Sequence, residues 1–357
     1  MKRLTQLVLS AIFLGLICLG IGYWINHGHI GNQSEERLYV YNWGEYIDPE
    51  LIDRFESETG IRVIYETFDS NEAMEAKIRN GGTRYDVAFP SDYTIEKLRK
   101  GNLLHRIDKD AIPNMKHLDP SYLNQPFDPN NQYSIPYFFG TVGILYDQEV
   151  YPNIRFDSWN DLKKPELKND VLLVDGAREI MGLSLNSLGY SLNDTNQTHL
   201  AEAESHLKSF APNIKGVVGD EIAMMLEQHE ANVAVIWSGS AAPIFNADDR
   251  FNYVVPKDGS NLWFDNMVIP KTAQNVKGAH QFINFLLEPD VNKQNTEWVE
   301  YGTPNQTARN MLPEEIRHDI RVYPTKEEQQ RLEVYKDLGP DVLNEYNERF
   351  LNFKMAL

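Results

Sequence analysis

Residues 135–146 read IPYFFGTVGILY, an extended and nearly all-apolar stretch in the middle of a 357-residue chain. A strand that is covered on both faces gives a continuous apolar run of this kind. We interpret the stretch as a crossover strand between two lobes, with a return crossover from Leu262 to Pro270. A chain of this length, 42% of it apolar, exceeds the size at which a single core usually divides, which agrees with two lobes.

Strand-like and helix-like segments alternate on each side of this crossover. In order along the chain they are strand 37–41, helix 49–56 ended by Gly60, strand 61–65, helix 74–78, strand 87–90, strand 171–174, helix 178–188, strand 233–237 and helix 278–287. Such alternation predicts parallel sheets. The predicted fold class is therefore α/β, with two α/β lobes joined by crossing hinge strands and a ligand cleft between them.

We expect three parts in the chain. Residues 1–36 form an N-terminal signal or anchor segment with its linker. The first lobe comprises residues 37–140 and 266–318, and the second lobe comprises residues 141–265 and 319–357. Because the carboxyl ends of the strands converge on such a cleft, the loops that follow them are the expected place for a ligand.

The N-terminus carries a targeting segment. Lys2 and Arg3 precede an almost unbroken apolar run over residues 7–25, closed by Tyr23 and Trp24 at the expected aromatic interface. The run is about long enough to span a bilayer and no clear Ala-x-Ala site follows it, so we favour an uncleaved anchor. By the positive-inside rule the rest of the chain is exported. We expect an extracytoplasmic protein attached to the outer face of the cell membrane, or a periplasmic or secreted one if the signal is cleaved.

Cysteine content and charge exclude several classes of function. The only cysteine, Cys18, lies inside the apolar run, after residues 15–17 (GLI), which make a poor lipidation signal. The rest of the chain can have neither a disulfide nor a cysteine metal site. With 34 Lys and Arg against 52 Asp and Glu, the formal net charge of −18 argues against nucleic acid as a partner. The same charge attracts cations.

Catalytic constellations are scarce in the sequence. It contains no His-Glu-x-x-His pair, no Gly-x-Ser-x-Gly elbow and no phosphate-binding glycine loop. His27 and His29 stand in the linker without further ligands, so we expect neither a metal site nor a cofactor. These observations predict a binding protein and not an enzyme.

Four predicted loops place aromatic rings beside carboxylates or hydroxyls, each at an expected strand end: 43–46 (WGEY), 91–93 (SDY), 237–240 (WSGS) and 263–265 (WFD). An aliphatic polyamine combines separated ammonium groups with methylene segments, so its receptor needs carboxylates for the charges and aromatic walls for the chain. A single Trp or Tyr at a strand end packs against the core more often than it contacts a ligand. Recurrence at four loops favours a ligand site.

Other acidic residues stand at predicted helix starts. Position alone predicts that Asp175 caps the helix after it and that Glu179 complements the helix dipole. Asp220 and Glu221 precede another helical stretch at 222–226 and are interpreted as first-turn acids without a further function.

Seven short segments, in order along the chain, carry a family resemblance: 41–46 (YNWGEY), 58–61 (ETGI), 69–72 (DSNE), 127–131 (FDPNN), 177–179 (ARE), 263–265 (WFD) and 303–305 (TPN). Through them the chain resembles the spermidine/putrescine-binding proteins from about Leu38 onward. The resemblance implies a type II periplasmic-binding-protein fold that closes on its ligand like a hinge. It also implies the extracellular solute-binding subunit of an ABC importer, which captures polyamines and delivers them to the permease subunits.

The resemblance implies the ligand-binding residues as well. The aromatic cage falls on Trp43, Tyr46, Tyr93, Trp237, Trp263 and Tyr301, with Ser91 as a polar contact, the ammonium-binding carboxylates on Glu179 and Asp265, and Tyr335 at a position where an amide is common. For Glu179 this ligand role overrides the interpretation as a helix-start acid alone, although the two roles are compatible.

Three positions depart from the family pattern, namely Gly44 in place of a hydroxyl residue, Gly176 in place of an acid, and Tyr335 in place of an amide. Loss of the acid is expected to weaken one ammonium subsite unless Asp175, Glu45 or Asp220 compensates. The preference between spermidine and putrescine therefore stays open.

Two other functions stay open at this point. Stacked aromatics beside carboxylates also suit a sugar or a quaternary ammonium solute. An anchored hydrolase could use Asp265 and Glu179 as an acid/base pair across the cleft. The expected partners are a polyamine ligand, the permease subunits and, through the N-terminal segment, the membrane.

Overall fold

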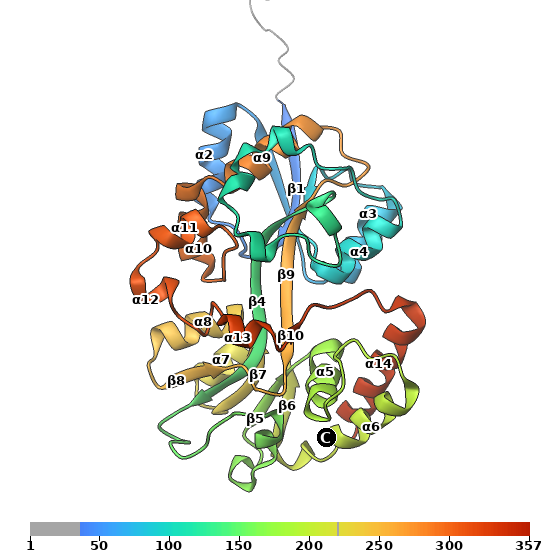
Figure 1. The fold of residues 1–357 in the computed structure, drawn as a ribbon, viewed down its shortest axis with the longest axis vertical. Coiled ribbons are helices and arrows are strands. Elements are labelled where there is room, and N and C mark those ends of the chain that lie inside the picture. Colours follow the sequence, from blue (N-terminus) through green and yellow to red (C-terminus); the bar gives the residue numbers. More distant parts are fainter. Residues whose placement is uncertain (1–35, 220) are drawn as a thin grey trace, which may run out of the picture.

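The structure is a computed structural model that describes residues 36–219 and 221–357 (Figure 1). The predicted targeting segment, Cys18, the two linker histidines and Asp220 lie outside the described residues. Within the described ranges, no helix is long and apolar enough to cross a membrane.

The first lobe begins with three strands and three helices that alternate. They are β1 (Arg37–Trp43), α2 (Pro49–Thr59), β2 (Arg62–Phe68), α3 (Asn71–Asn80), β3 (Val87–Ala88) and α4 (Asp92–Lys100). β1 pairs in parallel with both β2 and β3, as the alternation predicts. Gly60 ends α2 with a left-handed φ of 72°, a conformation that glycine adopts without steric cost. Four short 3₁₀ helices follow, at Lys109–Ala111, Pro113–His117, Pro120–Tyr122 and Pro129–Asn131.

Two long strands, β4 (Ser134–Asp147) and β9 (Ser260–Val268), run between the lobes side by side (Figure 1). They pair antiparallel, with Phe139 opposite Phe264. Every residue of β9 is buried, and its four polar side chains, Ser260, Asn261, Asp265 and Asn266, each form hydrogen bonds. The predicted crossover and its return are both confirmed as strands.

The second lobe is a second α/β unit. Its elements are 3₁₀ helices at Trp159–Lys163, Pro165–Leu167 and Ala211–Asn213, β5 (Val171–Val174), α5 (Ala177–Ser187), α6 (Gln197–Leu207), β6 (Ile214–Val218), α7 (Glu221–Glu227), β7 (Val233–Trp237), α8 (Ser238–Ala247) and β8 (Phe251–Val254). β5 pairs in parallel with β6 and β7, while β7 and β8 pair antiparallel with β4.

After β9 the chain returns to the first lobe and then crosses again to the second (Figure 1). These elements are α9 (Val276–Leu286), α10 (Pro289–Val299), α11 (Gln306–Met311), α12 (Glu314–Arg317), α13 (Lys326–Gln329), β10 (Leu332–Glu333) and α14 (Gly339–Lys354). α9 to α11 lie in the upper lobe of Figure 1, and α14 packs against α5 and α6 in the lower lobe.

The strand order β2-β1-β3-β9-β4-β7-β5-β6 shows how one connected sheet serves both lobes. Separate apolar cores lie on each side of the crossing strands: Phe55 and Phe282 belong to a core of the first lobe, and Trp159 and Phe350 to one of the second. The positions within β4 and β9 at which we divided the lobes remain a prediction.

Candidate functional site

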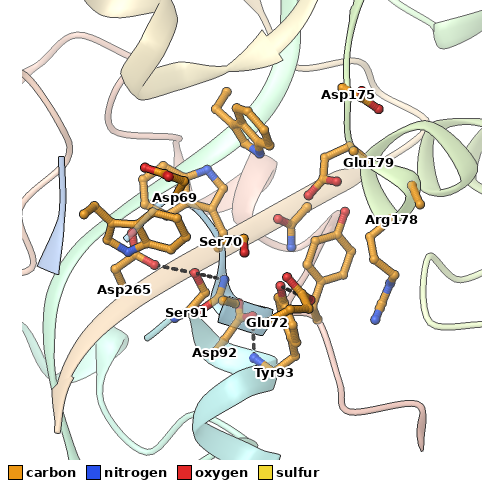
Figure 2. Close-up of a pocket in the computed structure, with 18 of the residues that line it drawn as sticks. Asp69, Ser70, Glu72, Ser91, Asp92, Tyr93, Asp175, Arg178, Glu179 and Asp265 are labelled. Atoms are coloured by element: carbon orange, nitrogen blue, oxygen red, sulfur yellow. Dashed lines mark hydrogen bonds between the residues drawn. The ribbon is translucent and has the colours of Figure 1, made fainter. Parts of the chain in front are cut away.

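A cavity of about 610 Å³ lies between the two lobes, within the range usual for small-molecule sites. Side chains from both lobes line it (Figure 2). All ten residues predicted for the ligand site lie on its wall: Trp43, Tyr46, Ser91, Tyr93, Glu179, Trp237, Trp263, Asp265, Tyr301 and Tyr335. The structure therefore brings together residues that are up to 292 positions apart (335 − 43) in the sequence.

Strand ends and helix starts supply most of these side chains. Trp43 ends β1, Trp237 ends β7, and Ser91 and Tyr93 stand at the start of α4. The segment 263–265 is different, because it lies in the middle of crossing strand β9 and not at a strand end. That part of the prediction was wrong: a hinge strand passes beside the cavity and presents side chains along its length.

Asp265 is a buried acid of the cavity that is held by two hydroxyl groups. Only 7% of it is exposed, and its carboxylate accepts hydrogen bonds from the hydroxyls of Tyr46 (2.7 Å) and Ser91 (2.6 Å). Both donors are neutral, and within the described ranges Asp265 forms no ion pair. Burial raises its pKa to about 6, although the two hydroxyl hydrogen bonds act in the opposite direction. A cation placed beside this carboxylate would supply the missing charge.

Ser91 is held in place by a residue that the sequence analysis did not single out. The Asn71 side chain donates to Ser91 Oγ at 3.0 Å and accepts from the Ser91 backbone N–H at 3.0 Å. Ser91 occupies the N-cap position of α4, yet its hydroxyl makes no cap hydrogen bond there, since it donates to Asp265. Asn71 and Ser91 together fix one side of the carboxylate.

Glu179 lies in the first turn of α5, on the second lobe. Its carboxylate is hydrogen-bonded by its own backbone N–H and by the side chains of Trp237 and Tyr335. Burial raises the pKa of this group, and these hydrogen bonds partly offset the effect. The helix-start position and the place on the cavity wall therefore coexist.

Asp175 does not cap α5, contrary to the expectation from position. The N-cap residue is Gly176, and Asp175 instead pairs with Lys354 of α14 at 2.7 Å. The reason is a tertiary contact, because the last turn of α14 brings the ammonium group of Lys354 to the Asp175 carboxylate. In the first turn of α5, the Glu179 carboxylate accepts from its own backbone N–H in place of Asp175. Of the other proposed compensating acids, Glu45 is exposed and is not one of the cavity-lining residues.

The aromatic side chains form a connected wall. Tyr301 packs edge-on against Tyr46 (5.2 Å between ring centroids) and Trp263 (5.6 Å), and Tyr93 packs edge-on against Tyr335 (6.4 Å). The indole N–H groups of Trp43 and Trp263 donate to the backbone carbonyls of Phe89 (2.9 Å) and Thr141 (3.3 Å). Rings fixed in this way offer flat apolar surfaces and electron-rich faces to a ligand.

The cavity wall carries six acids and one basic residue: Asp69, Glu72, Asp92, Asp175, Glu179 and Asp265 against Arg178. The Arg178 guanidinium donates to Lys336 O and Asn193 Oδ1 and stacks on the Tyr335 ring at 4.3 Å. In Figure 2 it points away from Asp265. The cavity is therefore acidic on balance, which favours a cationic ligand.

Asp92 was missed as a cavity residue, although the segment 91–93 was singled out. Its side chain is fully buried and accepts from the backbone N–H groups of Tyr93 (2.7 Å) and Phe264 (3.4 Å). Burial, together with the nearby charge of Asp265, raises its pKa well above the ordinary value. Among the described residues no group of three or more His, Cys, Asp or Glu is arranged to hold a metal ion.

Comparisons with known proteins agree with the fold. The family model for bacterial extracellular solute-binding proteins matches residues 50–322. The spermidine/putrescine-binding periplasmic proteins of Salmonella typhimurium and Escherichia coli are 39% and 40% identical, over 99% and 95% of each chain. The putrescine-binding periplasmic protein PotF of Escherichia coli is 31% identical over 87% of this chain and 89% of its own.

Solved structures agree as well. A putative spermidine/putrescine ABC transporter protein from Listeria monocytogenes is 56% identical, with a TM-score of 0.85 over 90% of this chain and 100% of its own. A spermidine/putrescine ABC transporter substrate-binding protein from Streptococcus pneumoniae is 48% identical, with a TM-score of 0.84 over 90% and 99%. The predicted type II periplasmic-binding-protein fold is confirmed. The chain belongs to the bacterial extracellular solute-binding proteins, a family of transport proteins and not of enzymes, and within it to the spermidine/putrescine-binding proteins.

Proposed function

We propose that this protein is the extracellular solute-binding subunit of an ABC importer, which captures a polyamine and delivers it to the membrane permease. The observation that carries the proposal is Asp265, a buried carboxylate whose side-chain partners in the described part of the chain are two neutral hydroxyls and which faces an aromatic cavity. The names of the relatives, which bind spermidine or putrescine, support the same ligand class over a sugar.

The geometry accounts for binding without any bond being made or broken. Asp265 of the crossing strand β9 neutralises one ammonium group, and Glu179 of α5 in the second lobe neutralises another. A carboxylate about 4 Å from an ammonium contributes about 4 kcal/mol before desolvation at an effective dielectric near 20. A cation–π contact adds about 0.5–2 kcal/mol. The carboxylates therefore govern charge recognition, while rings such as Trp263 flank the methylene segments.

Closure of the lobes connects capture to delivery. Because Asp265 is held by Tyr46 and Ser91 of the first lobe while Glu179 lies on α5 of the second, a diamine or triamine bridges the two carboxylates only when the cleft is closed. The ligand thereby stabilises the closed form in proportion to its greater affinity for that form. We infer that the permease recognises this closed form.

The ligand assignment is tested by calorimetric titration with putrescine, spermidine and spermine, alongside maltose and choline. Saturable binding of at least one polyamine, with no heat from maltose or choline, is the expected result. Binding of maltose or choline with none of any polyamine would reject the proposed function.

We further propose that the N-terminal segment holds the protein uncleaved at the outer face of the membrane. This rests on the sequence alone, on the basic residues before the apolar run and the absence of a clear cleavage site. The test is the N-terminal sequence and mass of protein recovered from native membranes. A mature chain that starts after Gly22 would refute the anchor.

A further inference from the structure

Gly176 leaves a space that the carboxylate of Glu179 occupies. A Cβ atom added at Gly176 would lie 2.2 Å from Glu179 Oε2 and 2.9 Å from its Cδ, closer than real Cβ contacts allow. The backbone does not require glycine here, since φ of −138° and ψ of 113° suit any residue. The absence of a side chain at position 176 therefore makes room for the Glu179 carboxylate and is not required by the backbone conformation.

At the other end of the cavity, the Asp265 carboxylate is held more firmly in place than Glu179. The Asp265 carboxylate is held by the hydroxyls of Tyr46 and Ser91, and it lies on a fully buried strand. The separation between the two ammonium-binding carboxylates thus depends mainly on where the Glu179 side chain lies.

The cavity also continues on the Gly176 side. Its wall there includes Asp175 and, from α14, Leu343 and Asn347. Asp175 is already paired with Lys354, so its charge is compensated within the protein. Glu179, by contrast, forms no salt bridge with any described residue, and its carboxylate lies against the backbone of Gly176.

We propose that Gly176 is a specificity-determining residue: by letting the Glu179 carboxylate lie back from the centre of the cavity, it fits the site to a triamine such as spermidine better than to the shorter diamine putrescine. This inference rests on the proposed polyamine function. Gly176 itself contacts no charge of the ligand and acts as a positioning residue for Glu179.

The test measures the ratio of the dissociation constants of putrescine and spermidine in the wild type and in Gly176→Ala. In the wild type spermidine binds more tightly. In Gly176→Ala the new methyl group takes the space that the Glu179 carboxylate occupies. We expect the carboxylate to move toward Asp265 and the ratio to fall by about fivefold or more in favour of putrescine. Retained putrescine binding in the variant also shows that it is folded.

Gly216→Ala is the matched control. Gly216 lies on β6 of the same lobe, and an added Cβ there meets its nearest neighbours at 3.9 and 4.0 Å, ordinary contact distances. The ratio is expected to stay at its wild-type value in this variant. A second variant, Glu179→Gln, removes the charge that Gly176 positions, and adding Gly176→Ala to it should leave the ratio unchanged, as coupled residues require.

The outcomes separate the inference from the function on which it rests. If the wild type binds no polyamine, the proposed function fails. If polyamines bind but the wild type favours putrescine, or Gly176→Ala weakens both ligands equally, or its effect persists beside Glu179→Gln, the role of Gly176 is rejected while the function stands.

Discussion

Asp265 shows how one residue can favour binding at the expense of the free protein. Taking a carboxylate out of water without a cationic partner costs free energy, which here appears as a pKa raised to about 6. The hydroxyls of Tyr46 and Ser91 offset part of that cost. A ligand ammonium recovers the remainder, so the site is most stable when occupied.

Replacing Asp265 with asparagine tests this at the level of binding. Asp265→Asn keeps the shape but leaves a buried ammonium unpaired, so we expect polyamine affinity to fall by more than about tenfold. Calorimetry at pH 7.5 measures it. Asp157→Asn makes the same charge change at an exposed acid paired with Lys257, and should leave affinity near the wild-type value. An unchanged dissociation constant in Asp265→Asn would remove this residue from the site.

The same substitution should stabilise the ligand-free protein at neutral pH. With a folded-state pKa of about 6 against an ordinary 3.8, the native state holds this proton more tightly than the unfolded state. Stability therefore falls as pH rises from about 4 to 6, by on the order of 2 kcal/mol, and Asp265→Asn escapes that fall. Urea unfolding should find the variant more stable than the wild type at pH 7 and nearly equal at pH 4. A difference that does not depend on pH would contradict the assignment.

At the scale of elements, the start of α8 meets the first lobe at Gly239. A Cβ there would lie 2.1 Å from the Tyr301 ring, and near the other end of α8 Asn246 donates to Glu300 at 2.9 Å. α8 and the end of α10 are thus in contact across the two lobes. Helix propensity alone would favour alanine at position 239. Glycine is needed there because the Tyr301 ring leaves no space for a Cβ atom.

Gly239→Ala should therefore hold the lobes apart without weakening α8. We expect putrescine and spermidine to lose affinity together, by about tenfold or more, with their ratio unchanged. Calorimetry and the radius of gyration from X-ray scattering, with and without ligand, measure this. The wild type should contract on binding and Gly239→Ala should not. Contraction equal to that of the wild type would exclude a role for this contact in closure.

The elements differ in how far the sequence predicts them. β5 (Val171–Val174) and β7 (Val233–Trp237) were predicted with their observed bounds, because short apolar runs there end at clear polar breaks. The sequence predicts the segment 263–265 at a strand end, as one of four loops with aromatics beside carboxylates or hydroxyls. In the fold it lies within buried β9, whose surroundings come from two lobes distant in sequence.

At the scale of the whole molecule, the site is assembled from segments that only the tertiary fold brings together. The four aromatic loops already contain seven of the ten predicted residues, and family resemblance adds Glu179, Tyr301 and Tyr335. Local patterns could not distinguish Glu179 from a helix-start acid or exclude Asp175 as a cap. Neither family resemblance nor local patterns predicted Asp92 as a cavity residue. Its burial beside Asp265 follows from the packing of α4 on β9, which no local pattern encodes.

The net charge of −18 should act on the rate of capture more than on the lifetime of the complex. An acidic protein attracts a cation from a distance, and salt screens that attraction, so we expect the association rate constant of spermidine to fall by about tenfold or more between 10 mM and 500 mM NaCl. The dissociation rate constant should change little, because contacts inside the closed cavity are shielded from salt. Stopped-flow tryptophan fluorescence can follow both rates, since Trp43, Trp237 and Trp263 line the cavity. Putrescine, with one charge fewer, should show a shallower salt dependence; equal slopes, or an association rate that ignores salt, would show that capture proceeds without steering by the protein's charge.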